Sequence, residues 1–315
     1  MPEQKIYDVV IIGAGPSGLT AAIYTVRRAY KTLVISKDIG GQMSLTENIE
    51  NYPGFKQISG PILAQKMKEQ AEGFGADFIF SEVDRIEKLD KEFLVATVDG
   101  QKVQARAVIL SFGLTPRNLD VPGEKELTGR GVAYCATCDG PLYKDKDLVV
   151  VGGANAALDA AEYLSKLAKQ VYILVRKDKF RGEQVLIDRV MHTENIKVIF
   201  GGVTKKIIGQ NKVDGLTYLD AQQQEQTIKV DGVFIEIGHI AKTDWLKHLL
   251  NLNSNNEVLV SADNETSLPG IFAAGDLTQI TYKQVVISAG EGAKAALQAC
   301  KYLQGGKLVG PDWGK

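Results

Sequence analysis

Two glycine-rich turns constrain the fold of this chain more than any other feature, because each follows a short β-branched run and precedes an apolar-periodic stretch. Residues 9–12 lead into Gly13-Ala14-Gly15-Pro16-Ser17-Gly18, and residues 32–35 form the next β-like run. Residues 148–151 lead into Gly152-Gly153-Ala154-Asn155-Ala156-Ala157, and residues 171–175 close that unit. Each segment predicts strand, turn, helix and strand, which is a βαβ unit. Two such units predict an α/β fold with two Rossmann-like dinucleotide-binding domains and mostly parallel sheets.

The first turn matches Gly-x-Gly-x-x-Gly between a strand and a helix, the context that separates this short pattern from an ordinary glycine-rich turn. Gly13 would make the tight turn, Gly15 would let the backbone approach a pyrophosphate, and Gly18 would let helix and strand pack closely. The helix N-terminus would supply amide donors to the phosphates. The second strand ends at Ser36 without an acidic residue at that point. The motif alone therefore leaves the nucleotide open.

The second turn departs from the pattern at one position. Gly152 is retained and Ala157 is the accepted small residue at the third position, but Ala154 replaces the second glycine. Its methyl group stands where the backbone would meet a pyrophosphate, so it is either tolerated or weakens binding.

Three cations follow the second strand of this unit: Arg176, Lys177 and Arg181. No acidic residue stands at the strand end itself. Cations there suit the 2′-phosphate of NADPH, whereas an acid would suit the free 2′-hydroxyl of NADH. The alternative is a solvated basic turn, since exposed Lys and Arg are common.

Cys135-Ala136-Thr137-Cys138 is followed directly by Asp139. In a Cys-x-x-Cys pair one thiolate attacks a partner disulfide and the other resolves the mixed disulfide. Asp139 would act as acid or base if burial raises its pKa. A structural zinc site needs a second ligand pair. Cys300 is alone and the three histidines are scattered, so we expect no metal and place Cys300 in the core.

Composition excludes several classes of protein. The chain has 37 basic and 38 acidic residues, so no global field favours nucleic acid or an anionic membrane. No stretch approaches the roughly 18 apolar residues of a membrane span, and the apolar run near the N-terminus is too short for a signal-peptide core. We therefore expect a cytoplasmic protein, in which cysteines serve redox chemistry rather than a disulfide framework.

Together these residues resemble the small type of thioredoxin reductase, over nearly the whole chain. The most specific piece is Cys135-Ala136-Thr137-Cys138-Asp139-Gly140 just before the second βαβ unit. The supporting motifs are Gly40-Gly41-Gln42, Glu50-Asn51-Tyr52-Pro53-Gly54, Val121-Pro122-Gly123-Glu124 and Gly275-Asp276. The resemblance implies that the second domain is inserted in the first, with boundaries near 1–115, 116–243 and 244–315. It implies FAD in the first domain and NADPH in the second.

The resemblance also implies individual binding residues. Asp276 would hold the ribitol region of FAD, while Gln42, Asn51 and the segment Lys283-Gln284-Val285 would lie near the isoalloxazine ring. The full set implied for FAD is Gly13, Gly15, Pro16, Ser17, Gly18, Gly41, Gln42, Asn51, Gly113, Gly275, Asp276, Lys283, Gln284 and Val285. The set implied for NADPH is Gly152, Gly153, Asn155, Ala156, Arg176, Lys177 and Arg181.

A mechanism follows from the same resemblance. The family is homodimeric, and its nicotinamide-binding domain rotates so that either the dithiol or the nicotinamide faces the flavin. Residues 113–117 and 238–242 lie where such hinges would be needed. The family suggests that Cys138 is the cysteine that faces the flavin. The implied partner is thioredoxin, or a thioredoxin-like or glutaredoxin-like protein.

Two departures keep other interpretations open. The family usually has His-Arg-Arg after the second strand with a further Arg four residues on, whereas this chain has Val175-Arg176-Lys177 with Arg181 retained. Lys lacks the planar fork of Arg, and relatives without this nicotinamide site use another donor. Residues 282–295 also resemble the flavoprotein of alkyl hydroperoxide reductase. The alternatives are therefore ferredoxin, reduced flavin or NADH as donor, a glutaredoxin-like or peroxiredoxin-linked acceptor, or a flavin redox sensor without turnover.

Overall fold

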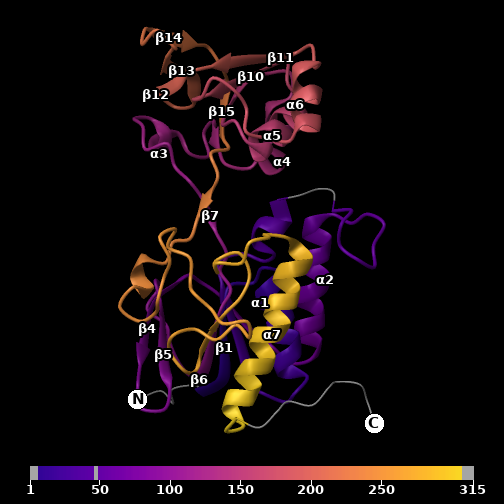
Figure 1. Ribbon diagram of the computed structural model, residues 1–315, viewed down its shortest axis with the longest axis vertical. Helices are drawn as coiled ribbons and strands as arrows, with labels where there is room; N and C mark the ends of the chain where they lie inside the picture. Colours follow the sequence, from indigo (N-terminus) through magenta and orange to yellow (C-terminus); the bar gives the residue numbers. More distant parts are fainter. Residues whose placement is uncertain (1–5, 46–48, 307–315) are drawn as a thin grey trace. The chain divides into compact units, whose positions relative to one another are not determined.

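The protein is described by a computed structural model that covers residues 6–45 and 49–306. It divides into two compact units (Figure 1). Unit 1 comprises the described residues up to Leu114 and from Ala241 onward, and unit 2 comprises Thr115–Ile240. The second unit thus interrupts the sequence of the first.

Unit 1 is built on a seven-stranded sheet in the order β3-β2-β1-β6-β5-β4, with β17 paired to β6. Its strands are β1 (Ile6–Ile12), β2 (Thr32–Ser36), β3 (Asp77–Phe80), β4 (Val83–Lys88), β5 (Phe93–Thr97), β6 (Lys102–Leu110) and β17 (Ile271–Ala273). The strands β1, β2, β3, β6 and β17 are parallel, and β4 and β5 add an antiparallel edge. The β1 residues Val9, Val10 and Ile11 are fully buried, as expected of a central strand covered on both faces.

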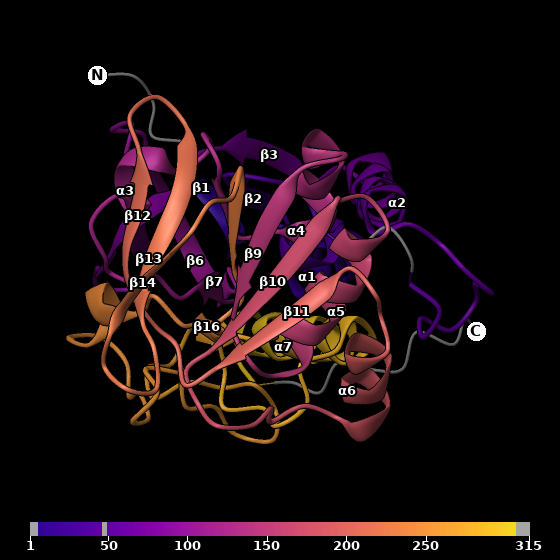
Figure 2. The same ribbon diagram turned by 90° about the horizontal axis from the view of Figure 1, so that it is seen from above.

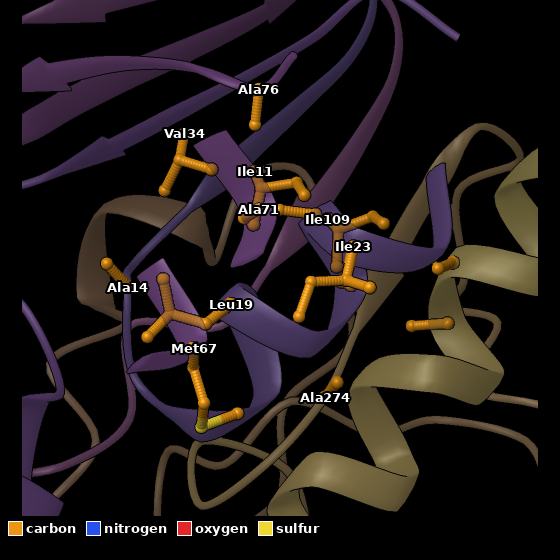
Figure 3. Close-up of a cluster of buried hydrophobic side chains, with 14 of the residues drawn as sticks. Ile11, Ala14, Leu19, Ile23, Val34, Met67, Ala71, Ala76, Ile109 and Ala274 are labelled. Atoms are coloured by element: carbon orange, nitrogen blue, oxygen red, sulfur yellow. The ribbon is translucent and has the colours of Figure 1, made fainter. Parts of the chain in front are cut away.

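Three helices cover one face of this sheet, and Figure 1 shows them lying side by side. They are α1 (Pro16–Val26), α2 (Gly60–Gly73) and α7 (Val285–Leu303). Figure 3 shows Leu19 and Ile23 of α1 and Met67 of α2 among the side chains of the sheet. The helix α2 begins where Ser59 caps it by accepting from the Ile62 amide. Helix α7 passes so close to α1 that a methyl group on Gly292 would lie 2.0 Å from the Ser17 carbonyl oxygen.

The Lys-, Ala- and Leu-rich stretch near the C-terminus predicts a helix from about Glu291 to Leu303, and the predicted start was wrong. The helix begins at Val285, and its first turns hold a β-branched run followed by Gly290. These residue types have low helix propensity. Packing overrides that preference, because Ser288, Ala289 and Gly292 are buried.

The opposite face of the sheet is covered by the antiparallel edge and by the irregular segments on either side of β17. Leu246, Leu250, Val258 and Leu277 are buried there together with Phe93. The short 3-10 helices of this unit are η1 (Gly41–Leu45) and η3 (Asp244–Leu246). Both faces of the sheet are therefore covered.

Unit 2 contains a five-stranded parallel sheet in the order β11-β10-β9-β15-β8 and a three-stranded antiparallel sheet, β12-β13-β14. The strands are β8 (Val132–Ala133), β9 (Asp147–Val151), β10 (Gln170–Val175), β11 (Ile196–Phe200), β12 (Val203–Gly209), β13 (Val213–Leu219), β14 (Glu225–Ile228) and β15 (Gly232–Ile235). The helices are α3 (Glu124–Leu127), α4 (Ala136–Asp139), η2 (Gly140–Tyr143), α5 (Asn155–Ser165) and α6 (Gln184–Met191). In Figure 2, α5 and α6 lie on one side of the parallel strands and β12–β14 on the other. The predicted α/β fold with two Rossmann-like domains is confirmed.

The two predicted linkers pair with each other. The strands β7 (Thr115–Pro116) and β16 (His239–Ile240) form an antiparallel ribbon. The Arg117 amide donates to the Gly238 carbonyl at 2.9 Å. Their role as hinges stays a prediction.

Candidate functional site

The first glycine turn is built so closely that two of its glycines accept no side chain. Gly13 has a φ of +105°, and a methyl group on it would lie 2.5 Å from the Ser111 carbonyl oxygen. A methyl group on Gly18 would lie 1.9 Å from the Gly13 carbonyl oxygen. The Ser111 hydroxyl donates to the carbonyls of Ile12 and Gly13, both at 3.0 Å. The turn, strand and helix are therefore locked together at the carboxyl end of β1.

The middle glycine of this turn lies in open surroundings. A methyl group on Gly15 would come no closer than 4.0 Å to the Gly40 carbonyl oxygen, and one on Gly41 would lie 3.8 Å from the Gly15 Cα. The Gly40 amide donates to the Ala14 carbonyl at 2.7 Å, which holds the two segments opposite each other. Helix α1 starts at Pro16 and no side chain caps its N-terminus. Uncapped amides beside a bare glycine backbone fit a pyrophosphate.

A second group of predicted FAD residues meets the first turn of α1. Gly275 has a φ of +79°, and a methyl group on it would lie 2.7 Å from the Ser17 hydroxyl. The next residue, Asp276, accepts from the Ser288 hydroxyl at 3.1 Å. The structure thus brings the Gly275-Asp276 motif to the glycine turn across a long sequence separation.

Asn51 and Gln284, both predicted to lie near the flavin ring, are in contact. The Asn51 amide donates to the Gln284 side-chain oxygen at 3.2 Å, and α7 begins at the following residue, Val285. The Gln42 amide donates to the Leu114 carbonyl at 3.3 Å, one residue after Gly113. These two hydrogen bonds join four segments of unit 1 in two pairs.

The Lys283 side chain makes three hydrogen bonds within the protein. Its ammonium group donates to the carbonyls of Asp276 and Thr278 at 3.0 and 2.6 Å, and to the Glu257 carboxylate at 3.1 Å. Three acceptors use all the hydrogens of an ammonium group. The side chain therefore shapes the loop before α7, and a flavin contact of Lys283 would come from its backbone.

The second glycine turn is also closely packed. A methyl group on Gly152 would lie 2.2 Å from the Glu236 carbonyl oxygen, and one on Gly153 would lie 2.6 Å from a Val175 methyl group. Ala154 has a φ of −114° and a ψ of −176°, an extended conformation that any residue adopts. Its side chain is exposed, and no side chain caps α5. The alanine therefore strains nothing in the protein, and its effect depends on how closely a ligand approaches.

The predicted cationic cluster lies beside this turn. The Arg181 amide donates to the Gly153 carbonyl at 2.8 Å, which fixes Arg181 next to the start of α5. The side chains of Arg176, Lys177 and Arg181 are exposed. Within residues 6–45 and 49–306 none of the three makes an ion pair. Three exposed cations that follow β10 and make no ion pair among the described residues fit a phosphate group.

Asn155 links the glycine turn to a residue that the sequence analysis missed. Its side-chain oxygen accepts from the Glu183 amide at 2.8 Å, and its amide donates to the Glu183 carboxylate at 3.2 Å. Glu183 thus holds the Arg181–Glu183 segment over the start of α5. The Asn155 side chain is used within the protein, whereas the α5 amides, including that of Ala156, remain for a ligand.

Cys135 follows β8 and precedes α4, at the same sheet edge as the second glycine turn. It is half-buried and disulfide-bonded, and its sulfur lies 3.4 Å from the Thr137 hydroxyl. The side chain of Cys138 lies outside the described part of the structure. Burial raises the pKa of Asp139, which brings this carboxyl closer to the range of an acid–base catalyst. Cys300 is fully buried in α7, as predicted.

Two further acidic residues near the cysteine pair had no predicted role. Glu124 is 4 % exposed, and its carboxylate accepts from the amides of Leu119 and Asp120 at 2.8 and 2.7 Å and from the Tyr134 hydroxyl at 2.8 Å. Burial, followed by the bond to Glu124, raises the pKa of Tyr134 to about 12. Glu236 follows β15 and accepts from the Ala136 amide. An acid inside the apolar run 233–237 was the available signal for Glu236.

Among residues 6–45 and 49–306, no three His, Cys, Asp or Glu side chains gather in a group that would hold a metal ion. Over the same residues no helix has the length and apolar character needed to cross a membrane.

The family model "Pyridine nucleotide-disulphide oxidoreductase" matches residues 7–292, which include both glycine turns and the cysteine pair. The chain belongs to this family. Among curated members, the thioredoxin reductase of Bacillus subtilis is 42 % identical over 308 residues, covering 96 % of this chain and 97 % of the relative. The predicted resemblance to small thioredoxin reductases is confirmed.

Solved structures of the family agree. The thioredoxin reductase of Lactococcus lactis has a TM-score of 0.87 at 35 % identity, covering 95 % of this chain and 99 % of that one. A ferredoxin-flavin thioredoxin reductase of Clostridium acetobutylicum has a TM-score of 0.53 at 32 % identity, covering 96 % and 98 %. The family thus includes members named for different electron donors.

Proposed function

We propose that this protein is an FAD-dependent thioredoxin-disulfide reductase that takes electrons from NADPH and passes them through the Cys135–Cys138 pair to thioredoxin. The observation that carries the proposal is the sheet edge of unit 2, where Cys135 and the second glycine turn follow neighbouring parts of one parallel sheet. The likeness over 96 % of the chain to a thioredoxin reductase supports the same activity.

In this proposal unit 1 binds FAD, which accepts a hydride equivalent and passes two electrons onward. The amides at the start of α1 and the bare backbone of Gly15 and Gly41 bind the pyrophosphate. Asp276, oriented by Ser288, accepts hydrogen bonds from the ribitol hydroxyls. Asn51 and Gln284 border the ring, and their mutual hydrogen bond holds both side chains in place.

Unit 2 binds NADPH at the start of α5. The α5 amides meet the pyrophosphate, and Arg181, fixed by its bond to Gly153, meets the 2′-phosphate together with Arg176 and Lys177. The exposed cluster carries no internal counter-ion within the described residues, so it is available to a phosphate.

The cysteine pair then reduces the partner. Reduction of the protein's own disulfide takes two electrons and two protons and yields two thiols. One of these, as thiolate, attacks a sulfur of the partner disulfide, and the other resolves the mixed disulfide, which returns the partner as a dithiol. Asp139, whose pKa burial raises toward the range of an acid–base catalyst, serves as the proton donor to the departing thiolate.

The assembly and location belong to the same proposal. The resemblance supports a homodimer, which sedimentation velocity would detect as a particle of twice the 34.2 kDa chain mass. We place the protein in the cytoplasm, a reducing compartment in which a Cys-x-x-Cys pair serves redox chemistry rather than a structural disulfide.

A second candidate uses another donor. Ala154 and Lys177 depart from the usual nicotinamide site, and a ferredoxin-flavin thioredoxin reductase is among the similar structures. In that case ferredoxin, reduced flavin or NADH would supply the electrons, and the acceptor would still be a thioredoxin-like, glutaredoxin-like or peroxiredoxin-linked protein.

Anaerobic flavin bleaching separates the two candidates. The flavin absorbance of the purified protein is followed while NADPH and NADH are titrated separately, with dithionite as the positive control. We expect bleaching by NADPH at micromolar concentration and thioredoxin reduction by the same preparation. Bleaching by dithionite alone would contradict NADPH as donor. The variant Cys138→Ser is expected to retain FAD and to lose thioredoxin reduction, and retained turnover would contradict the role of the pair.

A further inference from the structure

The carboxyl edge of the parallel sheet in unit 2 carries one acid that the proposed mechanism does not use. The strand order β9-β15-β8 places β15 between the other two. Parallel neighbours end at the same edge of a sheet. The strand β9 leads into Gly152, β8 leads through Tyr134 to Cys135, and β15 leads directly into Glu236. Glu236 therefore stands between the nucleotide-binding turn and the cysteine pair.

Glu236 contacts both neighbours. Its amide donates to the Val151 carbonyl at 2.8 Å, and its own carbonyl oxygen would be 2.2 Å from a methyl group on Gly152. Its side-chain carboxylate accepts a hydrogen bond from the Ala136 amide, which belongs to the peptide that joins Cys135 to α4. The backbone of Glu236 thus supports the glycine turn while its side chain supports the cysteine.

The surroundings leave this carboxylate without a cation. The titratable groups on the elements that meet it are Tyr134 and Cys135 after β8 and Asp139 in α4, and the Gly152 turn adds none. The other elements packed against β15 add Asp147 of β9 and Asp214 and Tyr218 of β13. None of these groups carries a positive charge, and no ion pair of Glu236 occurs within residues 6–45 and 49–306. Burial raises the pKa of Glu236 to about 7, and the Ala136 hydrogen bond offsets only part of that effect. The group changes charge near neutral pH.

We propose that Glu236 is a positioning residue for the redox-active cysteine, which holds the Cys135–Ala136 peptide and controls by its charge the pH at which the Cys135 thiol ionises. The proposal rests on the proposed function only in taking Cys135 as redox-active. A negative charge beside a thiol disfavours the thiolate and raises the thiol pKa. The thiolate is the nucleophile. The two groups therefore titrate as a coupled pair.

The sign of the effect follows from the charges. Below neutral pH Glu236 is protonated and leaves the Cys135 thiol at its lower pKa. As the pH rises, Glu236 ionises and raises the thiol pKa, so the thiolate fraction grows over a wider pH range than a single group allows. The variant Glu236→Gln keeps an oxygen that accepts from Ala136 but carries no charge.

The test measures alkylation of Cys135 by iodoacetamide between pH 5.5 and 9.5, with peptide mass spectrometry, in the full-length Cys138→Ser protein. The midpoint of the rate profile is the readout, because accessibility scales the rate equally at every pH. In the Glu236→Gln background we expect the midpoint to be lowered on the order of one pH unit. The matched control is Glu225→Gln, which removes an exposed carboxylate from β14 of the same unit.

The outcomes are separable. A profile in the Cys138→Ser protein that follows one ionisation across the whole range overturns the proposal, and this result needs no variant of Glu236. An unchanged midpoint in Glu236→Gln, or an equal shift in Glu225→Gln, overturns it as well. Glu236→Asp, which keeps the charge, should keep the high midpoint. No nicotinamide or thioredoxin enters the assay, so a failure of the proposed function leaves this result standing.

Discussion

The two glycine turns differ in where they tolerate a side chain. In unit 1, Gly13 and Gly18 contact backbone so closely that a methyl group at either would overlap a carbonyl oxygen, while Gly15 has space around it. In unit 2, Gly152 and Gly153 are equally confined, but Ala157 occupies the position of Gly18 and is fully buried. A methyl group is therefore accommodated at this position in unit 2, whereas it would clash in unit 1. The same motif thus imposes different limits in its two copies.

The second position of the motif, Gly15 in unit 1 and Ala154 in unit 2, is the one at which the protein itself has space for a side chain. Gly15 has a φ of −74° and Ala154 has a φ of −114°, so neither position needs the left-handed conformation that favours glycine. The requirement for glycine there comes from the ligand, whereas at Gly13 and Gly18 it comes from the protein itself. Substitutions at the two kinds of position should consequently have different readouts.

The largest effect is expected from Gly18→Ala. Its methyl group would lie 1.9 Å from the Gly13 carbonyl, so the turn and α1 must separate. We expect a loss of about 3 kcal/mol or more in the free energy of unfolding and loss of FAD during gel filtration. The matched control is Gly73→Ala, where nothing lies within 4 Å of the added methyl group. Equal retention of FAD in both variants would show that the closeness of the first turn is unimportant.

In each unit one charged side chain holds a loop by several hydrogen bonds: Lys283 in unit 1 and Glu124 in unit 2. The two side chains should contribute differently to the free energy of unfolding. Glu124 is 4 % exposed and binds three backbone amides and Tyr134, whereas the Lys283 side chain is 27 % exposed. Glu124→Ala leaves those amides unsatisfied and should lower the free energy of unfolding by about 2–3 kcal/mol. Lys283→Met should cost less. Urea unfolding of both variants checks the order, and the reverse ranking would contradict it.

The variant Arg181→Ala tests whether the cationic cluster of unit 2 binds the 2′-phosphate of the nucleotide. Removing one phosphate-binding cation should raise the KM for NADPH about tenfold and leave the KM for NADH nearly unchanged. The control is Arg85→Ala, an exposed arginine of β4 in unit 1. Steady-state kinetics with both nucleotides measures the ratio. A proportional rise for both nucleotides would mean that the cluster does not read the 2′-phosphate.

The smallest effect is expected from Ala154→Gly. The alanine is unstrained and exposed, so its removal changes only the approach of the nucleotide. We expect a roughly two- to threefold lower KM for NADPH and a slightly lower melting temperature, because glycine adds freedom to the unfolded chain. A KM that rises would show that the methyl group contributes to nucleotide binding.

Local pattern was sufficient for much of the fold. The alternation of β-branched runs, glycine turns and apolar-periodic stretches predicted both βαβ units, because each element is specified by residues adjacent in sequence. It failed at the start of α7, where Val285 to Gly290 form helix only because the helix is packed against α1. Propensity is a weak preference that burial overrides.

The amino-acid sequence specifies which chemical groups are present: two glycine turns, a Cys-x-x-Cys-Asp segment and a cationic cluster. Which of these groups stand together depends on the fold. The strand order of the parallel sheet in unit 2 places Glu236 between Gly152 and Cys135. Loop packing brings the Arg181 amide to the Gly153 carbonyl and the Lys283 ammonium group to three internal acceptors. The physical reason is that sheet order and loop packing join residues far apart in the chain, and no local pattern encodes those contacts.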